Sequence, residues 1–204
     1  MATFTQDQLN AHLAAHADWL LDPAAGARLQ MPDADLSGLD LTRANLSKAI
    51  LKGAILQNAN LTFANLTVAD LTAVSLQDAI LIDASLEGTL FSHAILTRAD
   101  LTKCTANYTD FSHANLSGAL LREAFFHYAN LSQADLSSAD LSRVRFDRCD
   151  LSGANLSHAN LSGAIFYNTN LRAADLRGAN HKHARFSRSI FTDAVMNDHS
   201  NPFK

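Results

Sequence analysis

Small and large apolar residues recur with a period of five along most of the chain. Every fifth residue from Ala34 to Ala194 is small except Leu39, and most of these residues are alanine. Every fifth residue from Leu36 to Met196 is large, almost always leucine or phenylalanine, with the exceptions Ala106, His181 and Met196. Neither series contains an insertion or a deletion. Self-similarity this regular indicates a repeat architecture.

The period of five restricts the backbone shape. A small residue and the large residue two places later lie on the same face of an extended chain. The next pair begins three residues later, so a straight strand would turn it outward and the chain must bend once per repeat. An α-helix advances about 500° in five residues, which would spread the large residues around the whole cylinder. The pattern therefore predicts an all-β solenoid of very short strands joined by corners.

Phenylalanines suggest how many repeats form one coil. Phe126, Phe146, Phe166 and Phe186 recur at every fourth repeat. Like residues stacked on one wall would give this spacing, which corresponds to four repeats per coil. The repeats then make about eight coils, with backbones about 4.8 Å apart.

The repeat reads (A)(D/N)L(S/T)x, as in residues 59–63 (ANLTF) and 159–163 (ANLSG). This sequence closely resembles the pentapeptide-repeat family over about four-fifths of the chain. The resemblance implies a right-handed quadrilateral β-helix with the alanine and leucine positions inside. We therefore divide the chain into an N-terminal helix and capping segment (1–30), a β-helix (31–196) and a C-terminal tail (197–204).

Residues 5–21 have a helical pattern. Thr5 and Gln8 form a possible capping box, and Leu9, Leu13, His16 and Leu20 follow one helical face. Pro23 and Gly26 end the helix. Because the end of a solenoid exposes apolar core and unpaired strand edge, we expect this helix to cover the first coil. The alternative is that His16 and Trp19 form a recognition surface.

Composition is that of an ordinary single-domain protein with a net charge of −4. No apolar run is long enough to span a membrane and no signal peptide is visible, so we expect a cytoplasmic protein without a membrane span. Cys104 and Cys149 occupy small inward positions, too far apart for a disulfide, which fits a reducing compartment. Charge is uneven, because basic residues outnumber acidic ones in 101–204 while acidic residues dominate in 31–100.

Winding the chain at four repeats per coil stacks particular outward residues. Tyr108, Tyr128 and Arg148 form one column, which either stabilises the wall by stacking or binds a protein. Arg172, Arg177, Arg185 and Arg188 should ring the last coils, as a solvated end or as a site for an acidic partner. Large apolar residues such as Phe125 and Ile165 also lie outward, either scattered or as part of a contact patch.

The sequence carries fewer indications of function than of fold. We find no catalytic, cofactor or metal-ligand constellation, so an enzyme is not expected. Our first hypothesis is a scaffold or interaction module that binds an unknown protein through its outer faces. The family resemblance supplies the alternative, a DNA mimic that binds DNA gyrase or topoisomerase, as some quinolone-resistance members do. The slightly basic C-terminal half and the absence of projecting loops weaken that alternative, and the sequence does not favour direct nucleic-acid binding.

The C-terminal coil lacks an evident cap. Its apolar residues would invite self-association, and a twofold dimer is the commonest closed solution. We therefore expect a homodimer through this end, as quinolone-resistance members of the family also form. The candidate interface is Ile190, Phe191, Val195, Met196 and Phe203.

Overall fold

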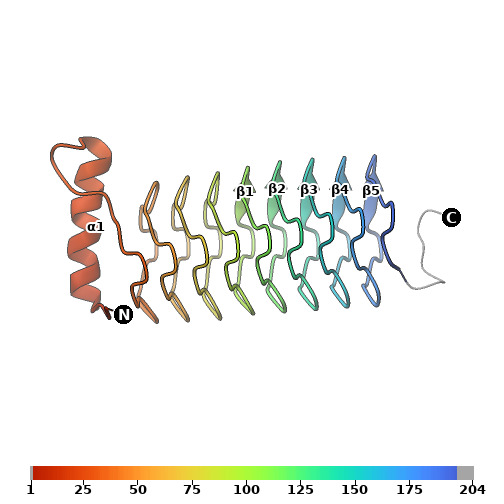
Figure 1. Ribbon diagram of the computed structural model, residues 1–204, viewed down its shortest axis with the longest axis horizontal. Helices are drawn as coiled ribbons and strands as arrows, with labels where there is room; N and C mark the ends of the chain where they lie inside the picture. Colours follow the sequence, from red (N-terminus) through yellow and green to blue (C-terminus); the bar gives the residue numbers. More distant parts are fainter. Residues whose placement is uncertain (1, 197–204) are drawn as a thin grey trace.

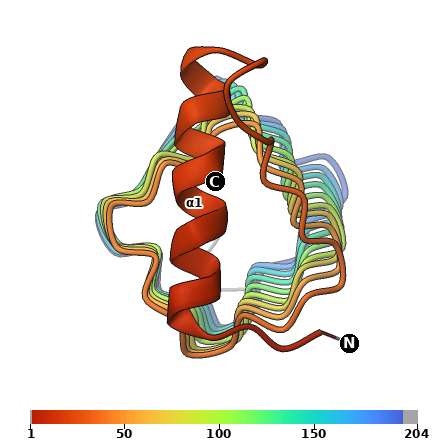
Figure 2. The same ribbon diagram turned by 90° about the vertical axis from the view of Figure 1, so that its left-hand side faces the viewer.

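The computed structural model describes residues 2–196 and contains one elongated solenoid with a helix across its N-terminal end (Figure 1). Parallel bridges join each wall to the same wall of the next coil, from Gln30↔Ile50 to Asp175↔Val195. Viewed along its axis, the solenoid has a four-sided outline (Figure 2). The expected quadrilateral β-helix with four repeats per coil is therefore confirmed.

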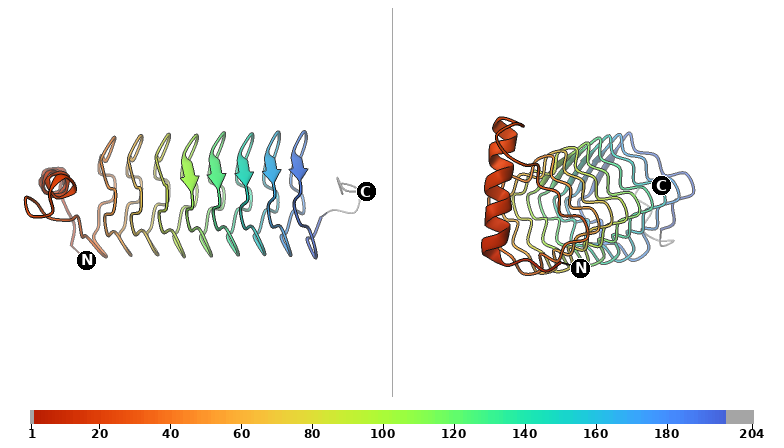
Figure 3. Two further views of the ribbon diagram at one scale, coloured as in Figure 1. Left: turned by 90° about the horizontal axis from the view of Figure 1, so that it is seen from above. Right: turned by 60° about the vertical axis from the view of Figure 1, so that its left-hand side comes forward.

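Regular strands occupy one wall of the C-terminal half (Figure 3). They are β1 (Thr105–Asn107), β2 (Phe125–His127), β3 (Arg145–Asp147), β4 (Ile165–Tyr167) and β5 (Arg185–Ser187). All five pair in parallel in chain order. These strands cover five coils, and the other coils of the solenoid pair through isolated parallel bridges at the same spacing of 20 residues.

The interior is filled by the two apolar series. Leucines at the large positions from Leu36 to Leu171 are at most 1% exposed. Phenylalanine rings stack on one another inside, with Phe91–Phe111 at 4.8 Å and Phe146–Phe166 at 5.1 Å between ring centres. Ala106 lies directly below Phe126 of the next coil and is small. The buried aromatic ring in the coil of Ala106 belongs to Phe111, which is on the neighbouring wall. Phe111 and Phe126 then meet edge to face at 6.0 Å.

Corners lie at every fifth residue from Asp33 to Asp193. All have positive φ, whether the corner residue is glycine or another type. Where an Asp or Asn precedes the large residue, it stabilises many corners by accepting a hydrogen bond from the backbone N–H two places on, as Asp35 does from Ser37 at 3.0 Å. The abundant Asp, Asn, Ser and Thr therefore serve local backbone geometry.

All polar residues at the small positions except Cys104 share one column. Thr89, Thr109, Cys149, Thr169 and Ser189 each donate to a carbonyl oxygen of the preceding coil, at distances from 2.7 Å to 3.4 Å. Their buried polar atoms are therefore satisfied inside an apolar core. Burial raises the pKa of both the Cys104 and the Cys149 thiols to about 12, which keeps them protonated.

Helix α1 (Gln6–Leu21) covers the first coil (Figure 2). Thr5 and Gln8 form the expected capping box. The Gln6 side chain donates to the Asp40 carbonyl and accepts from the Asp40 N–H, both at 2.9 Å. Gly26 approaches α1 so closely that a Cβ atom there would lie 2.2 Å from the Ala15 carbonyl oxygen. Hydrogen bonds from the Gln6 side chain thus attach the helix to the solenoid, in addition to the packing of Leu9 and Leu13 against the core.

His16 lies at the centre of this contact and is fully buried, so it does not form a recognition surface. Its Nδ1 accepts from the Leu29 N–H at 3.1 Å, and its Nε2 lies 3.0 Å from the Ser47 carbonyl oxygen. Only the neutral ring with its proton on Nε2 satisfies both contacts. Burial lowers the pKa of His16, and Arg28 nearby acts in the same direction.

Acidification should therefore loosen the cap. Below pH about 6.5 the unfolded chain takes up a proton on His16 that the folded chain resists, so stability falls as pH falls from that value towards the lowered pKa. We expect a smaller loss of stability between pH 7.5 and pH 5.5 in His16→Ala, which should itself cost about 1–3 kcal/mol at pH 7.5. Urea denaturation at the two pH values measures this, with the exposed His93→Ala as control. An unchanged pH dependence in His16→Ala would contradict the assignment.

Candidate protein-binding surface

The outward-facing side chains of β1–β5, together with the corner residue directly after each strand, form a surface that we call the strip. Its strand residues point outward because each centre, such as Phe126 or Phe146, points inward. Phe125, Phe126 and Ile165 in these strands are of the aromatic and β-branched types that favour an extended backbone. The strip consists of Tyr108, Phe125, His127, Tyr128, Arg145, Arg148, Ile165, Tyr167, Arg185 and Arg188.

Rings and guanidinium groups stack along the strip. Tyr108 and Tyr128 are parallel, with ring centres 5.5 Å apart, and Arg148 lies 5.4 Å from the centre of the Tyr128 ring. His127 packs beside Tyr128 at 4.5 Å. Tyr108 and Tyr128 remain 59% and 46% exposed. The stack therefore presents ordered aromatic surface to solvent.

Two further pairs repeat this arrangement. Arg145 lies 5.4 Å from the centre of the Phe125 ring, and Arg188 lies 5.7 Å from that of Tyr167. Arg145 also approaches Asp147 at 3.9 Å. Arg148, Arg185 and Arg188 form no ion pair with any residue in the described range 2–196. Most of the positive charge on the strip is therefore uncompensated.

The structure separates the residues that the sequence grouped. Tyr108, Tyr128, Arg148, Arg185 and Arg188 lie together on the strip. Arg172 and Arg177 lie two residues after Asn170 and Asp175, whose parallel bridges to neighbouring coils form the next two walls. Arg177 is also held by the Asp175 carboxylate at 2.6 Å. The basic residues of the last coils therefore lie on successive walls around the solenoid, and of these only Arg185 and Arg188 belong to the strip.

Sequence reasoning missed Arg145, His127 and Tyr167. Their signal was the recurrence at every fourth repeat, which places residues 105, 125, 145, 165 and 185 in one column and residues 107, 127, 147, 167 and 187 in another. Aromatic residues also lie between the arginines once neighbouring columns are combined.

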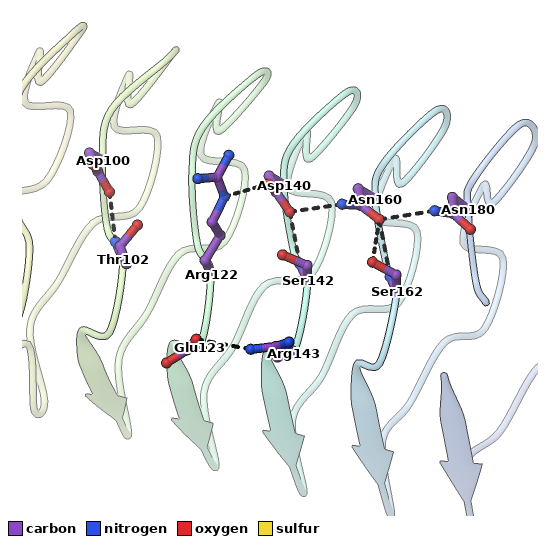
Figure 4. Close-up of polar contacts among 10 residues, drawn as sticks. All are labelled: Asp100, Thr102, Arg122, Glu123, Asp140, Ser142, Arg143, Asn160, Ser162 and Asn180. Atoms are coloured by element: carbon purple, nitrogen blue, oxygen red, sulfur yellow. Dashed lines mark hydrogen bonds and ion pairs between the residues drawn. The ribbon is translucent and has the colours of Figure 1, made fainter. Parts of the chain in front are cut away.

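A shallow hollow of about 310 Å³ lies on the wall before the strip, lined by Arg122, Glu123, Ser142, Arg143, Asn160 and Ser162 (Figure 4). Its polar groups bind one another. Asn160 donates to Asp140 at 3.1 Å, and Asp140 also accepts from Arg122 and from the Ser142 N–H. The Ser162 hydroxyl donates to Asn160 at 2.8 Å. These contacts hold successive corners in register, so we assign the hollow a structural role.

The C-terminal end carries the other candidate residues. Ile190 and Val195 are 41% and 47% exposed. Phe191 and Met196 are partly buried against the core. Phe203 lies outside the described residues. No group of three or more metal-ligating side chains occurs in residues 2–196, and no helix in that range is long and apolar enough to cross a membrane.

Solved structures and one family description match this chain. Two solved structures that match the chain are weak matches in shape. HetL, a pentapeptide repeat protein involved in heterocyst differentiation regulation from the cyanobacterium Nostoc sp. strain PCC 7120, is 28% identical, with 94% of this chain and 98% of HetL covered and a TM-score of 0.46. QnrB1, a plasmid-mediated fluoroquinolone resistance protein, is 17% identical, with coverage of 83% and 94% and a TM-score of 0.44.

No curated protein sequence matches the chain. The family description "Pentapeptide repeats" matches eight copies, in overlapping segments that run from residue 34 to residue 199. These segments include nearly the whole solenoid, and they repeat the five-residue pattern that fills its core. This chain therefore belongs to the pentapeptide-repeat family.

Proposed function

We propose that this protein is a non-enzymatic interaction module that binds a partner protein through the strip. The supporting observation is the exposed Tyr108–Tyr128 stack closed by Arg148. Tyrosine and arginine are enriched among the residues that dominate binding energy at protein interfaces. Stacking fixes these side chains before a partner arrives, so less conformational entropy is lost on binding.

The double variant Tyr128→Ala/Arg148→Ala should lose its partner without losing its fold. Truncating interface anchors of this type costs about 2 kcal/mol or more, roughly a thirtyfold loss in affinity. We would cross-link tagged proteins in cells that naturally contain the protein and quantify what co-purifies. The matched control is Arg43→Ala/Phe63→Ala, which removes another exposed pair, with Arg43 5.6 Å from the ring centre. Equal recovery with the strip variant and wild type would contradict the proposal.

A second proposal is the homodimer through the C-terminal coil. It is supported by the exposed Ile190 and Val195 at the end of the solenoid opposite α1 (Figure 1). Light scattering should then give twice the chain mass, and Ile190→Glu/Val195→Glu should give the monomer mass. A monomer at high concentration in the wild type would exclude this dimer.

The DNA mimic has less support. Outward aspartates alternate with asparagines, as in Asp110, Asn130 and Asp150, and Asn130 donates to Asp110 at 3.1 Å. This spacing dilutes the negative charge that a DNA mimic needs. A gyrase supercoiling assay with and without a quinolone tests the alternative, and protection from the drug would revive it.

A further inference from the structure

We infer that the strip receives an acidic segment of the partner protein, in which two carboxylates spaced by two coils of the solenoid meet Arg148 and Arg188. This inference rests on the proposed function and adds the chemistry of the partner. The two arginines occupy the same corner column, two coils apart. Because neighbouring coils lie about 4.8 Å apart, their backbone positions are separated by about 10 Å.

Stacking preserves this spacing in the side chains. Arg148 lies over Tyr128, which belongs to the preceding coil, and Arg188 lies over Tyr167, also one coil back. Both guanidinium groups therefore lean toward the preceding coil, Arg148 along the corner column and Arg188 toward the strand. A guanidinium group that stacks on a ring keeps its N–H edge available, and that edge matches a carboxylate with two parallel hydrogen bonds.

Charge identifies the ligand as acidic. Arg148, Arg185 and Arg188 are exposed and have no ion-pair partner among the residues that the structure describes. Asp147 is the single carboxylate on the outer faces of β1–β5, and it already lies near Arg145. A segment with two carboxylates would neutralise the positive charge of arginines that have no ion-pair partner in the described part of the chain.

Protein carboxylates fit this surface better than a nucleic acid does. A nucleic acid carries a charge at every nucleotide, so its phosphates would also approach Asp147 at the end of β3 and Asp150 on the next wall. A protein segment places its acids at chosen intervals. It also has apolar side chains that pack on Tyr108 and Ile165, which are 59% and 37% exposed.

Rigid peptides can measure the spacing. Polyproline rises about 3.1 Å per residue with three residues per turn, so glutamates at positions i and i+3 lie on one side about 9 Å apart, and those at i and i+6 about 19 Å apart. We would titrate fluorescein-labelled proline peptides of both designs, the short-spaced and the long-spaced peptide, with the full-length protein and follow anisotropy. The short-spaced peptide should bind at least about fivefold more tightly than the long-spaced peptide, although both carry the same charge.

Variants assign the binding to the arginines. Arg148→Ala/Arg188→Ala should weaken binding of the short-spaced peptide about tenfold, while Arg43→Ala/Phe63→Ala should leave it unchanged. Equal binding of the two peptides, or no loss in the arginine variant, would overturn the inference. Tighter binding of a short single-stranded DNA at the same salt concentration would also overturn it. If neither peptide binds but the strip variant still loses its cross-linked partner, the acidic segment is wrong and the proposed function stands.

Discussion

Deleting Ser137 alone should abolish folding of the solenoid beyond that point, whereas deleting residues 129–148 should leave a folded, shorter solenoid. The single deletion moves every later repeat out of phase with the coil below. Leucines that are buried in the wild type would then face water, and each would contribute about 1.5–3 kcal/mol less to the free energy of unfolding. The deletion of a whole coil joins Tyr128 to Cys149 and keeps every small and large position in its column.

Circular dichroism and amide hydrogen exchange measure both outcomes. We expect slow exchange throughout the coil-deleted protein and fast exchange after residue 137 in the other. A protein that tolerates the single deletion would have a core that does not depend on register. A protein that fails to fold after loss of a whole coil would show that the coils are not equivalent units.

Phe146→Ala should lower the free energy of unfolding by about 3–5 kcal/mol, because the residue is fully buried and collapse around the cavity is limited. Its ring lies between Phe126 at 4.9 Å and Phe166 at 5.1 Å, and the strands β2 to β4 hold these rings one coil apart. Denaturant titration measures the loss.

Tyr128→Ala provides the matched control for Phe146→Ala. Tyr128 also stacks on a ring from the preceding coil, but it does so on the outside of the wall and is 46% exposed. We expect this substitution to cost no more than about 1.5 kcal/mol, the range of an aromatic pair. Equal losses in the two variants would mean that the interior and the outer wall contribute alike to stability.

The period of five was sufficient to predict the interior, because a repeat that short leaves one arrangement for the small and large residues. The phenylalanine spacing added the four-sided coil. Positive φ at corner residues such as Phe63 and Val68 has no local signal in the sequence. Those residues adopt it because the ladders on both sides of the corner require it.

The candidate surface was harder to predict. Tyr108, Tyr128 and Arg148 were found because they share a column. Arg145 and His127 lie in neighbouring columns, and their contacts depend on side-chain directions that spacing does not give. The role of His16 was missed for a related reason, since its two partners, Leu29 and Ser47, come from segments outside the helix. Long-range contacts to backbone groups leave little trace in a single sequence.

Site-specific photo-cross-linking tests the central claim most directly. This claim is that a solenoid with a filled interior binds its partner protein through the strip. A photo-reactive phenylalanine analogue would replace Tyr128 in one protein and Phe63 in another, and both would be expressed in cells that naturally contain the protein. We predict a discrete cross-linked protein from position 128 and none from position 63. Equal cross-linking at the two positions, or cross-linking from position 63 alone, would contradict the account.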